Sequence, residues 1–496
     1  MSEGLAAAGK RQLWPGDDFP SWLSPMIVKE LRQGVQSGAF AWTFIGLQGA
    51  MFLLMSFALT VSERGMTAGP DFVHTLFWMI VGVGVLLVVP LRGMGAISSE
   101  RIGNNLDLVR LTRLSATRIV IGKWLAIVAQ AALLVVAVLP YVVLRYFFGG
   151  VNVIRDLEVV AWLLAGSMAV AAAALALSTQ PLAARIGAGA GAWPLAIAML
   201  QVVNTRGFVT WGSAGRLAAV AALALSTVAL LEYTASRIAP VAENHALRKR
   251  LLALFVGIAW LCVAVWGDAG ATQAMAFLAL PIVLMAAIEA VLERPVHLVS
   301  QARAFVRYAL PGRCAARLLT PGWATGLLFT VVLAVVCGSA WWITHARFKS
   351  PGGWTAALAS ATALSAAVFF PLPFLVYIPR VRYRLLPYAL IQLLCFMAFV
   401  YAEAMKPPAL AWKNWPLGWR AMLPLPLASL GSLLASEGKP EIAGAVIVAS
   451  GIVAAVFCVA VLPAWLREMR EGERVLDAAR TGRPGRTLPG GPGAAA

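Results

Sequence analysis

Runs of about 20 apolar residues recur along almost the whole length of this 496-residue chain. The hydrocarbon core of a bilayer is about 30 Å thick, and a helix of roughly this length crosses it. Hydrophobic residues make up 60% of the chain and charged residues only 12%, well outside the composition of soluble domains. The sequence therefore predicts an all-α, polytopic integral membrane protein.

About twelve of these runs are long enough to form transmembrane helices. They lie at approximately 39–61, 72–91, 124–144, 157–178, 186–203, 217–236, 251–266, 271–291, 323–343, 354–377, 386–403 and 441–464. The apolar segment 421–435 is shorter and carries Pro424 and Pro426, so we interpret it as a re-entrant element. An even number of crossings places both termini on the same side.

The distribution of basic residues predicts which side this is. The formal net charge is +18, but Lys and Arg occupy short loops between apolar runs instead of clustering on a polar domain that could bind nucleic acid. If each span crosses the membrane in the direction opposite to the one before it, most of the 40 Lys and Arg residues fall on the same side as the N-terminus. The positive-inside rule makes this side the cytosol. We expect a multi-pass plasma-membrane protein, as in a bacterial inner membrane, surrounded by lipid and with both termini cytoplasmic.

Two segments outside the apolar runs carry further information. The segment 21–38 precedes the first run and has the pattern of an amphipathic helix that lies in the membrane interface. Its apolar face holds Ile27, Val28, Leu31 and Val35. The basic loop 98–123 separates the second and third runs, and Ser115 is placed to cap a helix that enters the third run. By pattern alone, the two segments are either an ordinary anchor and a positive-inside loop or contacts for a cytosolic partner.

The residues of these segments match two motifs. The first motif comprises Ser24, Pro25, Met26, Ile27, Val28, Lys29 and Glu30. The second comprises Glu100, Arg101, Gly103, Leu106, Asp107, Leu108, Leu111, Thr112, Leu114 and Ser115, followed by Ile119, Val120, Gly122 and Lys123. In this order around the first three spans, they resemble the membrane-spanning subunits of type-2 ABC transporters, the export-type permease family.

The resemblance implies a permease subunit of an ATP-driven exporter. It makes 21–38 the connecting helix, with Pro25, Lys29, Glu30 and Arg32. It makes 98–123 the coupling loop that receives motion from a separate cytosolic ABC ATPase. The residues that it assigns to coupling are Glu100, Arg101, Gly103, Leu106, Asp107, Leu108, Thr112 and Ser115. A six-span permease-like unit would cover 39–240. The second six-span region, 241–466, is either a second permease unit or an added domain, and the pathway is formed by one chain, a homodimer or two permease chains.

No catalytic, cofactor or metal site is expected in this chain. Gly4 to Lys10 has the spacing of a phosphate-binding loop, but Arg11 stands where Ser or Thr is required. ATP and magnesium are therefore expected on the partner ATPase. The four histidines His74, His245, His297 and His345 are scattered, and none is expected to join a metal-binding cluster.

Four charged residues lie near span ends: Arg145, Glu232, Glu289 and Glu403. We expect them to reach the headgroup region, although a buried functional charge is the alternative. An ion-coupled secondary transporter, the second hypothesis, would need charges nearer the middle of a span than these; a polytopic membrane transferase is the third hypothesis. Residues 1–20 and 467–496 lack core-forming residues, and both are expected to be disordered.

Overall fold

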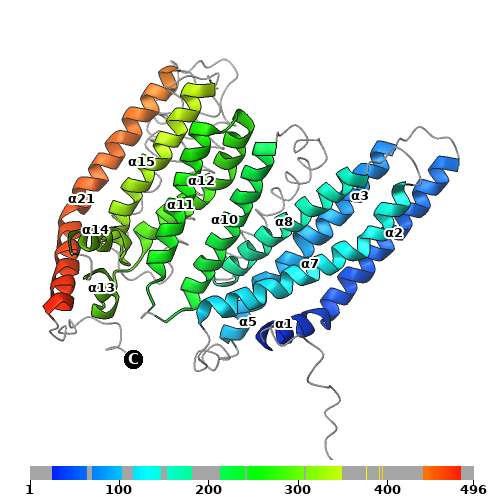
Figure 1. Cartoon of the computed structure of the whole chain (residues 1–496), viewed down its shortest axis with the longest axis horizontal. Helices are drawn as coiled ribbons and strands as arrows, with labels where there is room; N and C mark the ends of the chain where they lie inside the picture. The colour runs from blue at the N-terminus through cyan, green and yellow to red at the C-terminus, as the bar shows by residue number, and fades with distance from the viewer. Residues whose placement is uncertain are drawn as a thin grey trace, which may run out of the picture. The chain divides into compact units, whose positions relative to one another are not determined.

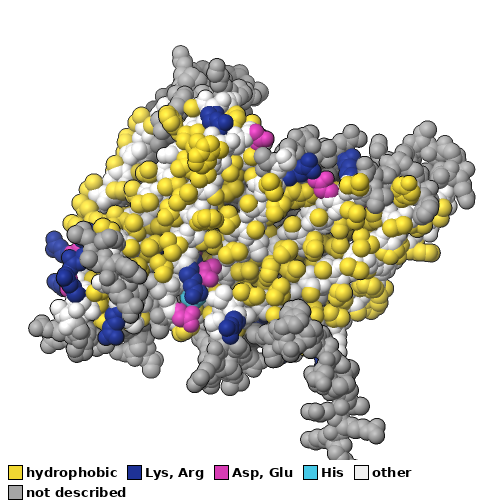
Figure 2. Space-filling view, viewed as in Figure 1, with side chains coloured by type: hydrophobic (Ala, Val, Ile, Leu, Met, Phe, Trp, Pro, Cys, Tyr) yellow, Lys and Arg dark blue, Asp and Glu magenta, His cyan; other side chains and the backbone are white. Residues whose placement is uncertain are grey.

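The structure is a computed structural model, and it describes residues 25–63, 70–102, 115–146, 153–180, 213–240, 243–306, 309–348, 376, 390, 394 and 440–481. Within these ranges all regular structure is helical and no strand occurs, as predicted. Eight of the described helices are long and apolar enough to cross a membrane. Figure 2 shows hydrophobic side chains covering the long sides of the helices, with charged side chains gathered mainly near helix ends. The chain is therefore a multi-pass membrane protein by length and composition of its helices.

The chain divides into two compact units, residues 1–206 and 207–496. The first contains a short amphipathic helix and four long helical segments (Figure 1). Its helices are α1 (Pro25–Val35), α2 (Gly38–Glu63), α3 (Pro70–Gly82), α4 (Val89–Arg92), α5 (Ala96–Ile102), α7 (Ala116–Tyr146) and α8 (Val153–Ser178). A π-helical segment, η1 (Val83–Val88), and a 3₁₀ segment, η2 (Gly93–Gly95), join α3, α4 and α5 into one continuous span.

A glycine permits close packing in this second span. A Cβ atom on Gly93 would lie 2.9 Å from Ile127 on α7 and 3.4 Å from Ala174 on α8. By contrast, Gly46 and Gly49 on α2 have nothing within 4 Å of that position. Close helix approach is therefore set by Gly93, where three helices meet, and not by the glycines of the first span.

The second unit is a bundle of long helices with two short helices at one end (Figure 1). The long helices are α10 (Ser213–Ile238), α11 (His245–Trp266), α12 (Ala269–Leu292), α15 (Trp323–Phe348) and α21 (Pro440–Thr481), and the short ones are α13 (Val299–Val306) and α14 (Ala309–Leu319). Trp260, Met275 and Phe329 lie in a buried apolar core between α11, α12 and α15. The sixth expected span, 217–236, corresponds to α10, which packs against α11 and α12 in this second unit.

Helix α21 is longer than a membrane crossing. Its 42 residues extend over about 63 Å at 1.5 Å per residue, roughly twice the thickness of the hydrocarbon core. Arg313 of α14 pairs with Asp477 of α21 at 3.0 Å, and Arg317 pairs with Glu473. The expectation of a disordered tail from residue 467 is therefore wrong for 467–481, which are helical. Glu473 and Asp477 are one turn apart, so they lie on the same face of α21 and pair with α14.

Several expected features lie outside the described residues. They are the spans 186–203, 354–377 and 386–403, the re-entrant element 421–435, the N-terminal 1–20 and the end of the tail after Thr481. The number of twelve crossings and the cytoplasmic side of the termini therefore stay predictions.

Candidate functional site

An ion pair joins the amphipathic helix α1 to the first part of α7. Lys123 Nζ lies 3.1 Å from Glu30 Oε1, and the Lys123 side chain is only 4% exposed. The two residues are 93 positions apart in the sequence. A buried ammonium group without a partner is costly, so this pair determines where α1 lies on the bundle.

A second polar group ties the junction of α1 and α2 to the second span. The Arg92 guanidinium, at the end of α4, donates to Gln130 Oε1 at 2.9 Å, to the Ser37 hydroxyl and to the Gly34 carbonyl. Ser37 Oγ in turn donates to the Gly34 carbonyl at 2.7 Å. Through Arg92 and Lys123, α1 therefore contacts α4, which precedes the loop 98–123, and α7, in which that loop ends.

The connecting-helix residues Pro25, Lys29, Glu30 and Arg32 all lie in α1. Of the coupling residues, Glu100 and Arg101 lie in α5. Ser115 immediately precedes α7, and its carbonyl accepts hydrogen bonds from the Arg118 and Ile119 amides, as expected at the start of a helix. The remaining coupling residues, Gly103, Leu106, Asp107, Leu108 and Thr112, lie outside the described residues.

Arg145 lies in the last turn of α7, at the end of the first unit opposite to Lys123. Its side chain does not extend away from the helices. Its side chain is 4% exposed and pairs with Asp156 of α8 at 2.7 Å. His74 Nδ1 lies 3.0 Å from the same guanidinium, which also lies over the Phe77 ring at 4.6 Å. The expectation of snorkelling is wrong for Arg145, because a carboxylate and an aromatic face from neighbouring helices stabilise the charge inside the bundle.

In the second unit, the Arg250 guanidinium of α11 connects three segments. It donates to the carbonyls of Leu318, Thr320 and Gly322 at 2.7 to 3.0 Å, and to Glu293 Oε2 at 2.8 Å. The side chain is 3% exposed. Gly322 has a φ of +144°, a conformation that favours glycine, and this turn directs its carbonyl to the guanidinium. Arg250 therefore fixes the turn between α14 and α15.

The acids near the same end of this unit are also paired. Lys249 lies 2.7 Å from Glu289 and 3.5 Å from Glu293. Glu232 lies 2.7 Å from His245 Nδ1 and is 11% exposed. Glu232 and Glu289 are thus largely buried and neutralised by neighbouring helices, whereas they were expected to extend to the headgroups; Glu403 lies outside the described residues.

Among the described residues, one group of side chains could hold a metal ion, and sequence reasoning missed it. His297, Glu468 and Glu471 present their ligand atoms within 4.8 Å of one another. His297 and Glu468 are 171 positions apart, so no local spacing reveals the cluster. Only the spacing of Glu468 and Glu471, one helical turn apart, was visible in the sequence.

The arrangement in the first unit suits transmission of motion, because the short helix α1 is bonded to α4, which precedes the loop 98–123, and to α7, in which that loop ends. Comparison of the chain with protein-family models, with curated proteins and with solved structures finds no match.

Proposed function

We propose that this chain is the membrane-spanning permease subunit of an ATP-driven exporter of the type-2 ABC class, and that a separate cytosolic ATPase drives it. One observation carries the proposal. Glu30 belongs to the connecting-helix motif and Lys123 to the motif at the start of the third span, and the two form a buried ion pair. Two motifs that were matched independently in the sequence thus lie at one site.

The contacts suggest how a movement at the loop 98–123 would spread. The loop begins within α5 and ends within α7. Arg92 links the segment before α5 to Ser37, and Lys123 links α7 to Glu30. A displacement of the loop by a cytosolic ATPase would therefore move the second and third spans together with α1. ATP and magnesium stay on the ATPase, and this chain supplies the coupling surface and the transmembrane route.

The proposal is tested by co-expressing the full chain with candidate ABC ATPases and purifying it in detergent. A candidate gene next to this one would encode a complete G-x-x-x-x-G-K-(S/T) loop. We expect the wild-type chain to retain such an ATPase. Glu100→Arg and Asp107→Arg should reduce the retained ATPase by about tenfold or more, since charge reversal at a contact costs at least about 1.4 kcal/mol.

Asp477→Arg is the matched control. It makes the same charge change at a residue that is exposed on α21, on the same predicted side of the membrane. It should retain the ATPase. The proposal is wrong if no ABC ATPase is retained, or if export in ATP-free vesicles runs on an imposed proton or sodium gradient, as a secondary transporter would.

A further inference from the structure

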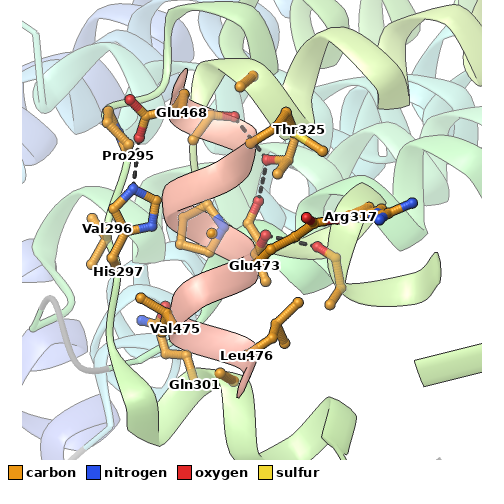
Figure 3. A pocket seen from close by; sticks show the side chains of 18 of the residues that line it. Pro295, Val296, His297, Gln301, Arg317, Thr325, Glu468, Glu473, Val475 and Leu476 are labelled. Atoms are coloured by element: carbon orange, nitrogen blue, oxygen red, sulfur yellow. Dashed lines mark hydrogen bonds and ion pairs between the residues drawn. The ribbon is translucent and has the colours of Figure 1, made fainter. Parts of the chain in front are cut away.

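Three potential metal ligands converge where α21 meets the segment between α12 and α13. His297 lies in the segment 293–298, and Glu468 and Glu471 lie one turn apart on α21. His297 Nε2 is 2.6 Å from Glu468 Oε1 and 3.8 Å from Glu471 Oε2. Figure 3 shows His297 and Glu468 directed toward each other across a pocket.

We propose that His297, Glu468 and Glu471 bind a divalent transition-metal ion of the zinc class, which fastens the end of α21 to the segment after α12. Zinc is held by histidine nitrogen and carboxylate oxygen at 2.0 to 2.2 Å. In a tetrahedral site, bonds of that length place neighbouring ligand atoms about 3.3 Å apart. The observed separations of 2.6 and 3.8 Å lie on either side of this value, so small side-chain rotations would complete the site.

A second histidine in the same unit provides an internal comparison. His245 also contacts two carboxylates, but Glu232 faces its Nδ1 and Glu243 faces its Nε2. These carboxylates lie on different sides of the ring, so one ion could not bind all three side chains. At His297, a single nitrogen faces both carboxylates, which is the arrangement that a shared ion requires.

The charges around the cluster also favour a cation. Among the described residues, neither Glu468 nor Glu471 forms an ion pair with Lys or Arg. Glu293, Glu473 and Asp477, which also lie at this end of the unit, do form such pairs, with Arg250, Arg317 and Arg313. In a chain of net charge +18, two carboxylates that converge on one histidine supply the two negative charges that balance a divalent ion.

The cluster is accessible to an ion from solvent. It borders a solvent-open pocket, which His297, Glu468, Gln301 and Thr325 help to line (Figure 3). The side chains of His297 and Glu468 are 24% and 20% exposed. A water molecule could therefore complete the coordination of a metal held by three protein ligands.

The experiment uses the full chain, purified in detergent without a polyhistidine tag, stripped of metal with a chelator and titrated with Zn²⁺. We expect one zinc ion per chain. Affinity should fall by at least about 100-fold in His297→Gln and Glu468→Gln, and by at least about tenfold in Glu471→Gln. His245→Gln, the matched control, should bind zinc like the wild type. Zinc should raise the melting temperature of the wild type and the control only.

Glu471→Gln keeps the test decisive if the other variants fold poorly, because its side chain is 44% exposed and contributes little to packing. The proposal is overturned if the wild type binds no zinc, or if the folded Glu471→Gln protein binds zinc as tightly as the wild type. Neither result depends on an ATPase, so the metal site and the exporter function fail separately.

Discussion

Among the Lys and Arg side chains of the described residues, those of Lys123, Arg145 and Arg250 are almost completely buried. Each has a carboxylate within 3.1 Å, supplied by a different helix or segment. A buried ion pair adds little net stability, but removing one partner is strongly destabilising because it leaves an unpaired charge. These pairs therefore specify which helices pack together, and a substitution in one of them has a predictable sign.

The Glu30–Lys123 pair is suited to a double-mutant cycle. Glu30→Gln should destabilise the protein by about 2 kcal/mol, because it removes the carboxylate that lies 3.1 Å from the buried Lys123 ammonium. Adding Lys123→Met should recover most of that loss. The measurement is thermal unfolding in detergent. Lys29→Met, at an exposed neighbouring position on α1, is the control and should change little. Equal losses in Glu30→Gln and Lys29→Met would show that the pair has no such role.

At the scale of elements, α12 and α15 pack with their backbones in contact. A Cβ atom on Gly326 would lie 1.9 Å from the Ala290 carbonyl oxygen, a distance that no side chain tolerates. Gly338, three turns further along α15, has nothing within 4 Å of the same position. The two glycines of one helix therefore have different roles, and only the first is required by packing.

Gly326→Ala should destabilise the second unit by about 2 to 3 kcal/mol, because the helices must separate to admit the methyl group. Gly338→Ala should be neutral or stabilising by up to about 1 kcal/mol, through the higher helix propensity of alanine. Melting temperatures of the two variants in the same detergent provide the comparison. If Gly338→Ala were the more damaging change, the packing of α15 described above would be incorrect.

The extension of α21 is the second element with a testable consequence. Its residues 467–481 are helical and pair with α14 through Glu473 and Asp477. We expect their amides to be protected in hydrogen–deuterium exchange mass spectrometry, since their hydrogen bonds are made within the helix. Arg317→Glu should lower this protection, by opposing like charges across the contact. Full exchange of these amides at the shortest labelling time would instead indicate the disordered tail.

At the scale of the whole molecule, each unit gathers its charged side chains at helix ends. In the first unit, one end holds Lys123 and Arg92, and the other holds Arg145. In the second unit, Arg250 marks one end, and Arg347 marks the other by donating to the Ala264 and Val265 carbonyls at the end of α11. Antiparallel helices of membrane-spanning length produce this pattern, with apolar side chains between the two charged ends.

A native cysteine allows a test of which side of the membrane each end of the second unit faces. Cys314 on α14 is exposed, on the side predicted to be cytosolic. A membrane-impermeant maleimide should label it in inside-out vesicles and not in intact cells. Cys314→Ser should abolish this labelling. In the Cys314→Ser background, a cysteine introduced by Trp266→Cys should be labelled only from outside the cell. Trp266 is the last residue of α11, at the end away from Arg250, and its side chain is 79% exposed. The reverse pattern would invert the topology.

The sequence by itself determined that this is a membrane protein and where most of the described helices lie. A helix that crosses a bilayer needs a long apolar run, and its backbone groups must form their hydrogen bonds within the helix. The sequence also located the amphipathic helix α1 from its periodicity and the start of α7 from Ser115. These features depend on residues within a few turns of one another, so a local pattern is sufficient to predict them.

The partners of the charged residues were decided only by the tertiary structure. Glu30 meets Lys123, Arg145 meets Asp156, and His297 meets Glu468 across 171 positions. The sequence placed Arg145 near a span end but did not reveal that Asp156 and Phe77 would surround it. The tail after residue 467 looked too polar to fold, yet α14 supplies the basic partners that its acids need. Hydrophobicity assigns a helix to the membrane, whereas the pairing of its few charges depends on which neighbours the fold brings within about 4 Å.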